Sequence, residues 1–463
     1  MHPDLWGGSD GSAYVGRADC VAGGGSVVNI VLIYPNMGDY RTKDAMTPLA
    51  IGILAALSPG HHLTFYDDRL EKIPDSLPDA DLIAISVETF TARRSYQLAD
   101  KFRQQGKKVA LGGCHITFMP DEAAAHADTL LLGDAEGAWE QMLADTECGT
   151  LRPRYQGDHS RPLTEYRLDR QIFAGKRYAP ISLVQYSRGC RFACDFCSIH
   201  AFYPGGVRTR PAAQVREEIL SLPANRFILF VDDNLFSGRR ALNDFLQMLA
   251  PLKRCWGCQI SIDIARDESM LDALAQAGCG FVLIGFESLN NANLRQMGKS
   301  WNHSAGDYAA VVAALHQRGI GIYGTFIFGY DDDTPDTIAQ CLRFAQENRL
   351  EVANFNLLNP TPGTALYDRL KSQGRLLSPH WWIDPDYRYG DPVFTPGGMS
   401  KDQLTTLCFQ TKTRFYRFGS VIRRLCRFSP RRRWRTLWVA WLVNIVSHRE
   451  IARKQGKQPG EKA

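Results

Sequence analysis

The chain has 463 residues, and 44% of them are hydrophobic, enough to fill two or three separate cores. The first 26 residues are rich in Gly, Ser and Asp and contain neither a basic start nor an apolar run, which argues against a secretory signal and predicts a disordered leader. Twelve cysteines in a chain of this length indicate reduced thiols, metal ligation or catalysis rather than a disulfide framework. We therefore expect a cytoplasmic protein.

The positive charge is concentrated at the C-terminal end. Residues 411–463 carry 15 Lys or Arg against 2 acidic residues, whereas the remainder carries 39 against 47. A run of arginines at 431–435 leads into an apolar stretch at 437–446, which is shorter than the roughly 20 residues of a membrane-spanning helix. The pattern favours a packed terminal helix with a solvated basic face, and peripheral contact with a membrane is the alternative.

Short apolar runs alternate with helix-length segments from residue 27 to residue 146. The runs lie at 28–34, 63–66, 82–87, 109–111 and 129–132. This alternation predicts a doubly wound, Rossmann-like parallel sheet, in which ligands bind beyond the carboxyl ends of the strands. Small or polar residues stand at three of those ends and suit a large, flat ligand, although the glycines also fit tight turns. They are Ser86 to Thr89, Gly112, Gly113 and Gly133.

A polar, proline-containing stretch at 147–180 is predicted to be a linker, and a second series of strands follows it. The runs lie at 181–186, 226–231, 259–263, 281–286, 321–328 and 352–358, each followed by a helical pattern. Six such units predict a partial (β/α)6 barrel of the TIM type over residues 181–375, with its chemistry at the carboxyl ends of the strands. Residues 376–463 are predicted to form a C-terminal helical cap.

Three thiols follow the first strand of this barrel in a CxxxCxxC spacing: Cys190, Cys194 and Cys197. An iron–sulfur cubane (4Fe-4S) needs thiolate ligands, and three cysteines leave one iron open for another ligand. A structural zinc site generally needs four closed ligands. Cys255 and Cys258 offer a second pair, but they are predicted at the opposite end of the barrel.

The cysteine spacing after the first strand of a partial barrel, with Phe196 before the last cysteine, resembles the radical S-adenosylmethionine (SAM) superfamily. The resemblance implies that the open iron chelates the amino and carboxylate groups of SAM. It also implies that one electron then cleaves a sulfur–carbon bond of SAM to give a 5′-deoxyadenosyl radical, while the protein orients and shields it.

The same resemblance assigns SAM contacts at later strand ends. It implies that acids after the second strand meet the amino group of SAM, that an acid after the fourth meets the ribose, and that a glycine-flanked strand lies near the adenine. The residues, with Phe196, are Asp232, Asp233, Glu287, Gly324 and Phe326. Taken without the resemblance, the two aspartates also fit ordinary caps, and Glu287 also fits an ion pair within the barrel.

The joining of a Rossmann-like domain to this barrel is similar to the cobalamin-dependent radical SAM enzymes, many of them methyltransferases. The similarity rests on four segments, at 47–49, 86–89, 112–115 and 133–136. It implies a cobalamin site without the histidine ligand of the Asp-x-His-x-x-Gly pattern, which the sequence lacks. His115 and His126 are not assigned as ligands. The implied cobalamin-binding residues are Ser86, Thr89, Gly112, Gly113 and Gly133.

The resemblance implies cobalamin-dependent methylation of an unactivated carbon in a hydrophobic small molecule, with flavodoxin or ferredoxin as electron donor. An aromatic segment of Trp381, Trp382, Tyr387 and Tyr389 fits either a substrate pocket or core. One alternative is a radical SAM cyclase, rearrangement or oxidative enzyme. Another is a non-enzymatic iron–sulfur or nucleic-acid-binding protein, but no RNA-binding domain is recognisable and we expect no nucleic acid partner.

Overall fold

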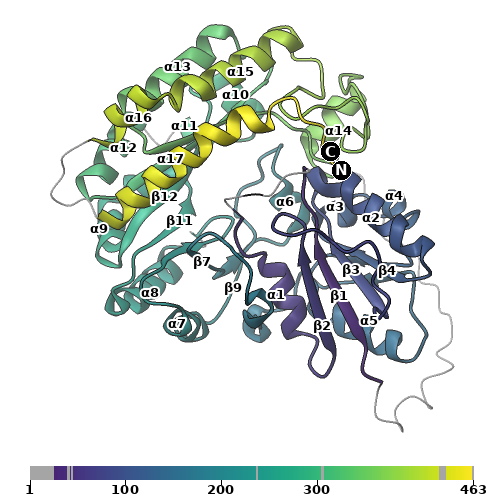
Figure 1. Cartoon of the computed structure of the whole chain (residues 1–463). Coiled ribbons are helices and arrows are strands. Elements are labelled where there is room, and N and C mark those ends of the chain that lie inside the picture. The colour runs from purple at the N-terminus through teal and green to yellow at the C-terminus, as the bar shows by residue number, and fades with distance from the viewer. Residues whose placement is uncertain are drawn as a thin grey trace.

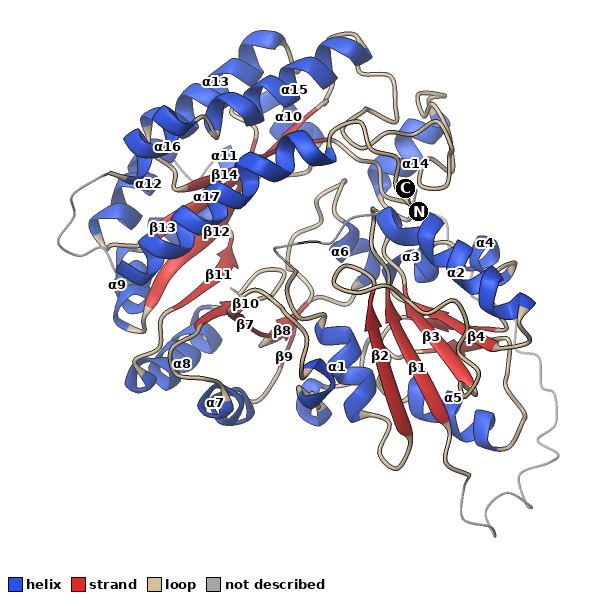
Figure 2. Ribbon diagram, in the orientation of Figure 1, coloured by secondary structure: helices blue, strands red, loops and turns tan. Residues whose placement is uncertain are grey.

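The structure, a computed structural model, describes residues 26–38, 42, 45–235, 238–303, 307–426 and 434–460. The described chain forms two six-stranded parallel sheets with helices around them, and three further helices near the C-terminus (Figures 1 and 2). The predicted α/β class is confirmed, with a doubly wound sheet followed by a partial barrel and a helical region.

The first sheet has the strand order β2-β1-β3-β4-β5-β6, and all of its neighbours are parallel. Its helices lie on both faces, as the alternating pattern predicts. The strands are β1 (Asn29–Tyr34), β2 (His62–Asp67), β3 (Leu82–Ser86), β4 (Lys108–Gly112), β5 (Thr129–Leu132) and β6 (Arg154–Gln156). The helices are α1 (Leu49–Ala56), α2 (Ala92–Gln104), α3 (Cys114–Phe118), α4 (Pro120–Ala124) and α5 (Ala138–Glu147).

Strand β6 lies inside the segment that the sequence analysis assigned to a linker. It is three residues long and only its central Tyr155 is buried, so it has no apolar run for a pattern to detect. Its pairing with β5 nevertheless extends the first sheet beyond residue 146.

The second sheet has the order β14-β13-β12-β11-β10-β7, so its six strands lie side by side in chain order and the sheet remains open. Its strands are β7 (Ile181–Val184), β10 (Phe227–Phe230), β11 (Trp256–Ile260), β12 (Cys279–Glu287), β13 (Gly321–Phe328) and β14 (Val352–Leu357). The connecting helices are α7 (Ala212–Ser221), α8 (Arg239–Leu249), α9 (Glu268–Gln276), α12 (Tyr308–Gln317) and α13 (Pro335–Glu347). Shorter helices are α6 (Ser198–Phe202), α10 (Asn291–Gln296), α11 (Ser300–His303) and α14 (Ala365–Ser372).

Three helices complete the chain: α15 (Lys401–Phe415), α16 (Phe418–Leu425) and α17 (Trp434–Lys454). Helices α15 and α17 pack on the edge strand β14, and α17 crosses the front of the second sheet in Figure 1. No helix among the described residues has the length and apolar character needed to cross a bilayer.

The segment before α15 joins the two sheet domains. Trp381 and Trp382 are each 1% exposed and share a hydrophobic core with Ile85 of β3 and Leu358, which follows β14. The two tryptophans are therefore core residues rather than the pocket lining that one of our alternatives assigned to them.

Candidate functional site

The cysteine loop, residues 187–197, begins at β8 (Ser187–Arg188), which pairs with β9 (Arg208–Thr209). Cys190, Cys194 and Cys197 are unpaired and partly exposed. Burial raises the pKa of Cys194 to about 12; the nearby Lys299 opposes this shift, and the charges of Cys197, Glu287 and Cys190 add to it. No three potential ligands among the described residues converge tightly enough for a single ion, but the thiolates of a cubane bind separate irons.

Two aspartates after β10 shape the start of this loop. Asp232 is 2% exposed and accepts hydrogen bonds from the Tyr186 amide at 3.2 Å and from the amide and hydroxyl of Ser187. Burial raises the pKa of Asp232 to about 7. Asp233 accepts a bond from the Gly189 amide at 2.9 Å. Both carboxylates thus cap backbone groups of the loop that carries the cysteines.

Side chains from distant segments hold the second half of the loop. Asp195 accepts hydrogen bonds from Tyr330 Oη and Arg369 Nη2, each at 2.6 Å. The ring of Phe192 stacks on Trp301 with centroids 3.7 Å apart. Sequence reasoning missed these partners, because they lie more than 100 residues from the cysteines and belong to no motif.

Glu287 occupies the end of β12 in a left-handed conformation, with φ of 61°, which costs a non-glycine residue about 1–3 kcal/mol. Its carboxylate accepts a hydrogen bond from Lys299 Nζ at 2.9 Å, and both residues are buried. Lys299 also lies within electrostatic reach of Cys194. The ion pair that we kept open for Glu287 is present, and it stands beside the cysteine loop.

Two other expected SAM contacts face away from the interior of the half-barrel. Phe326 is fully buried and stacks on Phe286 and Phe355, with centroids 5.6 and 5.2 Å away, in the layer between the sheet and its helices. A Cβ on Gly324 would meet Leu350 and Phe286 in the same layer. A contact between adenine and the Phe326 ring is therefore not supported, whereas the next residue, Ile327, points the other way and lines a cavity.

A cavity of about 250 Å³ lies between the first sheet and helices α1 and α5. It exists because adjacent strands carry small residues on one face: Ala84 pairs with Ala110, and Ser86 pairs with Gly112. Of the five residues assigned to cobalamin, four line this cavity and its mouth: Ser86, Gly112, Gly113 and Gly133.

Thr89 does not line it. Its hydroxyl instead lies 3.3 Å from Nδ1 of the buried His115. The Nε2 atom of His115 lies 3.3 Å from Glu122, and His126 pairs with Asp100 at 2.9 Å, so both histidines already have protein partners.

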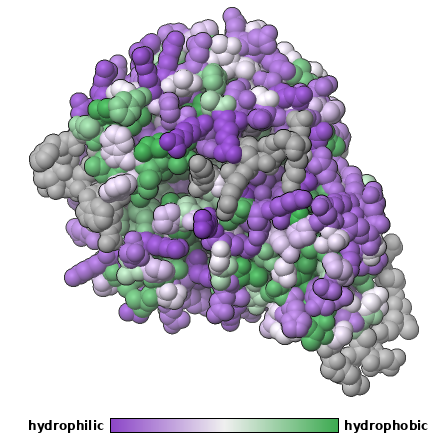
Figure 3. Space-filling view, viewed as in Figure 1, coloured by the Kyte–Doolittle hydropathy of each residue, from purple (hydrophilic) through white to green (hydrophobic). Residues whose placement is uncertain are grey.

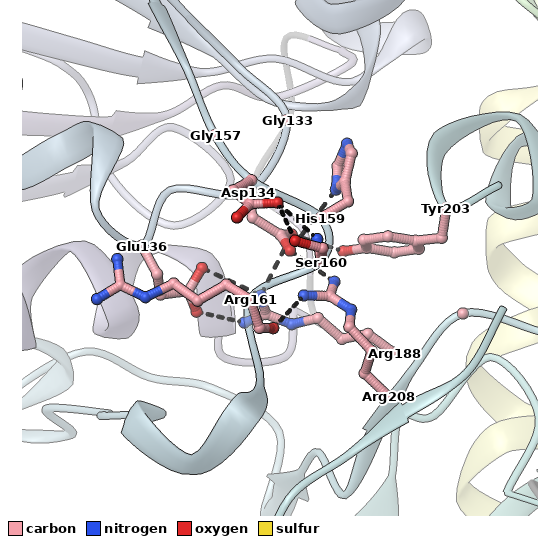
Figure 4. A network of polar contacts seen from close by, with 12 residues as sticks. Gly133, Asp134, Glu136, Gly157, His159, Ser160, Arg161, Arg188, Tyr203 and Arg208 are labelled. Atoms are coloured by element: carbon pink, nitrogen blue, oxygen red, sulfur yellow. Dashed lines mark hydrogen bonds and ion pairs between the residues drawn. The ribbon is translucent and has the colours of Figure 1, made fainter. Parts of the chain in front are cut away.

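A buried polar network closes the cavity on the barrel side (Figure 4). Arg188, two residues before Cys190, donates to both oxygens of Glu136 at 2.7 and 3.1 Å. Asp134 pairs with Arg188 at 3.2 Å and with Arg208 at 2.6 Å, and it accepts a bond from Tyr203. The loop after β5 of the first sheet is thus tied to the cysteine loop of the second.

A second cavity, of about 500 Å³, lies where the two sheets meet the C-terminal segment. Its walls combine aromatic rings, aliphatic side chains and charged groups from all three parts of the chain. They include Tyr34, Glu88 and Phe90 from the first domain, Phe196, Ile327 and Asn356 from the barrel, and Tyr387, Tyr389, Lys412 and Lys454 from the C-terminal region.

Known proteins are similar to this chain in sequence and in fold. The family model of the radical SAM superfamily matches residues 184–345. A bacteriochlorophyllide d C-12(1)-methyltransferase of Chlorobaculum tepidum is 30% identical over 415 residues, which cover 87% of this chain and 88% of the relative. A hopanoid C-2 methylase of Rhodopseudomonas palustris is 26% identical, covering 84% of this chain and 75% of the relative.

Among solved structures, the radical SAM methyltransferase TsrM from Kitasatospora setae, with cobalamin and a 4Fe-4S cluster bound, superimposes with a TM-score of 0.60. It is 16% identical, and the match covers 75% of this chain and 78% of that one. The cysteine loop and the half-barrel define an enzyme that uses SAM and a 4Fe-4S cluster. The chain belongs to the radical SAM superfamily.

Proposed function

We propose that this enzyme is a cobalamin-dependent methyltransferase that acts on an unactivated carbon of a hydrophobic small molecule. The observation that carries the proposal is the buried tie between Arg188 and the two acids Asp134 and Glu136. The tie joins the cysteine loop of the second sheet to the cavity of the first sheet domain, as two cofactors acting on one substrate require.

The chain's residues fit both groups. We propose that Cys190, Cys194 and Cys197 hold the cluster, and that Glu287 and Asp233 lie beside SAM with Phe196. The small residues Ser86 and Gly112 leave room for one arm of a cobalamin molecule in the smaller cavity. When bound, the cluster and SAM supply a carbon-centred radical that removes hydrogen, and cobalamin supplies a methyl carrier.

The second cavity is the proposed substrate site. Its aromatic and aliphatic side chains match the rings of a polycyclic molecule, and its charged groups, such as Lys412 and Lys454, match polar substituents on that molecule. The two relatives named above act by name on a bacteriochlorophyllide and a hopanoid. Phe196 lines it from the cysteine loop and Glu88 from the first sheet, so a substrate there contacts both domains. The partly exposed thiols leave the cluster reachable by a one-electron donor, for which we propose a flavodoxin or ferredoxin.

The proposal is tested first by cobalamin retention. The protein is reconstituted anaerobically with iron and sulfide, mixed with hydroxocobalamin and desalted, and corrin absorbance is read against protein. We expect retention near one per chain in the wild type and in Ser86→Ala, which keeps the space. Ser86→Phe fills the cavity and should lose cobalamin with its iron content unchanged. No retention by the wild type would remove cobalamin from the proposal.

The second test is the product. With SAM, a reductant and a polycyclic substrate, methyl transfer predicts a mass gain of one CH₂ per molecule. Both 5′-deoxyadenosine and S-adenosylhomocysteine should form with it. Cleavage of SAM with loss of hydrogen and no added carbon would instead identify a cyclase or oxidative enzyme.

A further inference from the structure

We propose that α16 and α17 dock the enzyme on an anionic membrane surface. Both helices expose large apolar side chains. On α17, Trp438, Leu442 and Ile445 are 60%, 45% and 48% exposed, and on α16, Phe418 and Ile422 are 71% and 37% exposed. Figure 3 shows hydrophobic residues where the two helices cross this face of the molecule. The proposal does not depend on the reaction proposed above.

The outward residues of α17 form one stripe. Positions 438, 442 and 445 follow the spacing of a single helix face, and Arg449 continues that face by one further turn. An apolar stripe that ends in a cation and includes a tryptophan is typical of helices that lie in the interfacial layer of a bilayer.

The inward side of α17 mixes apolar residues, among them Ala440 and Val443, with three buried polar ones. Thr436, Asn444 and Glu450 are 1%, 1% and 7% exposed. Asn444 accepts a hydrogen bond from Arg424 Nη2 and donates one to the Glu351 carbonyl, each at 2.9 Å. The helix therefore has apolar side chains on both sides, so its outer face is not the polar face expected of a helix that meets water.

The charge of the C-terminal part of the chain favours an anionic partner. Among the side chains described between residues 411 and 460, the exposed charged groups are all basic, and the single acid, Glu450, is buried. They are Arg414, Arg417, Arg423, Arg449 and Lys457. Anionic lipid headgroups complement this charge, and each basic residue near such a surface contributes about 1 kcal/mol to binding. Two copies of the chain joined through this face would instead bring like charges together.

Helices α16 and α17 pack against each other through a small hydrophobic core. Val421 and Leu425 of α16 form a small core with Ala440 of α17, and Leu437 and Trp441 pack against it. This core fixes α16 against α17, so the exposed apolar residues of the two helices belong to one packed unit.

The test is sedimentation of the full-length protein with lipid vesicles. We expect it to bind vesicles of phosphatidylcholine with one quarter phosphatidylglycerol, and to bind pure phosphatidylcholine at least tenfold more weakly. Trp438→Gln/Leu442→Gln should reduce binding about tenfold or more, since it removes two apolar anchors. Arg423→Gln/Arg449→Gln should reduce it about fivefold per arginine.

Leu220→Gln is the matched control, because Leu220 is 56% exposed on α7 and should leave vesicle binding unchanged. All of these side chains are exposed, so thermal melting should not move in any variant. Failure of the wild type to bind anionic vesicles would overturn the proposal. So would a dimer, seen by analytical ultracentrifugation without lipid, that Trp438→Gln/Leu442→Gln dissociates.

Discussion

Arg188 and Glu136 belong to different domains and form a two-point ion pair, with nitrogen–oxygen distances of 2.7 and 3.1 Å. The arginine is 5% exposed and lies two residues before Cys190. A forked guanidinium held at both nitrogens fixes orientation as well as distance. The pair therefore sets how the cysteine loop lies against the cavity of the first domain.

Glu136→Gln should destabilise the protein and lower cobalamin retention while leaving the iron content near that of the wild type. Losing one partner of a buried ion pair lowers the free energy of unfolding by about 3–5 kcal/mol. Because Arg188 keeps its contact with Asp134, we expect a loss near the lower of these values. Urea melts and corrin absorbance measure the two effects.

The control for that variant is Glu165→Gln. Glu165 pairs with Arg161 on the surface, where its side chain is 62% exposed, so its loss should cost under about 1 kcal/mol. Equal effects of the two substitutions on stability and retention would contradict the positioning role of Glu136.

Replacing any one of Cys190, Cys194 and Cys197 by Ala should abolish SAM cleavage and lower the bound iron. Cys255→Ala should do neither, because the Cys255 thiol is buried 3.9 Å from Thr436 of α17, away from the cysteine loop. Iron assay and 5′-deoxyadenosine release measure the outcome. A similar loss in all four variants would show that the ligands are wrongly assigned.

The sequence predicted both sheets because their strands are continuous apolar runs that parallel, buried strands require. We expected Phe326 near the adenine from the sequence, but its side chain lies in the helix layer. Successive residues of a strand face opposite sides of the sheet, so a shift of one position moves a side chain from the barrel interior to the helix layer. The sequence left open whether Asp232 meets SAM or caps a loop, and the cap depends on how β10 meets the cysteine loop in space. No sequence motif predicts the pairing of Glu287 with Lys299. Lys299 lies between α10 and α11, and the spacing of the residues does not show that this connection returns to the end of β12.

Glu287→Gln should weaken SAM binding about tenfold or more and leave the iron content near normal. The substitution keeps the shape of the side chain but removes its negative charge, which pairs with Lys299 and is proposed to meet SAM. The loss of one charge-assisted hydrogen bond to SAM costs about 1.5–3 kcal/mol of binding free energy. Calorimetric titration of the reconstituted protein with SAM measures it. Glu268→Gln, at an 82% exposed position, is the control, and unchanged affinity in both would place SAM away from Glu287.

Gly113→Ala should destabilise the protein far more than Gly112→Ala. Gly113 has a φ of 113°, and a Cβ there would lie 2.5 Å from the Val87 carbonyl oxygen, whereas a Cβ on Gly112 would meet Leu131 at an ordinary 3.5 Å. We expect a loss of about 2–4 kcal/mol for the first and under about 1 kcal/mol for the second, read from urea melts. Equal losses would contradict this account of the turn.

Glu122 of α4 should make stability depend on pH. Burial alone would raise its pKa, but hydrogen bonds from His115, Trp382, Tyr96 and His380 hold that pKa at about 2, against an ordinary 4.5. A depressed pKa means that the ionised form is favoured in the folded state. Its stabilisation is complete above pH 4.5 and is lost as the pH falls toward 2.

Glu122→Gln should therefore lower the free energy of unfolding at pH 7 by an amount on the order of 3 kcal/mol, and the difference from the wild type should shrink steadily below about pH 4.5. Urea melts at several pH values measure this convergence. Asp121→Asn is the neighbouring control, since the Asp121 side chain is 91% exposed and its pairing with Arg154 is screened by water. A difference between Glu122→Gln and the wild type that stays constant down to about pH 3 would show that the shape of the Glu122 network, rather than its charge, holds the C-terminal segment to the first domain.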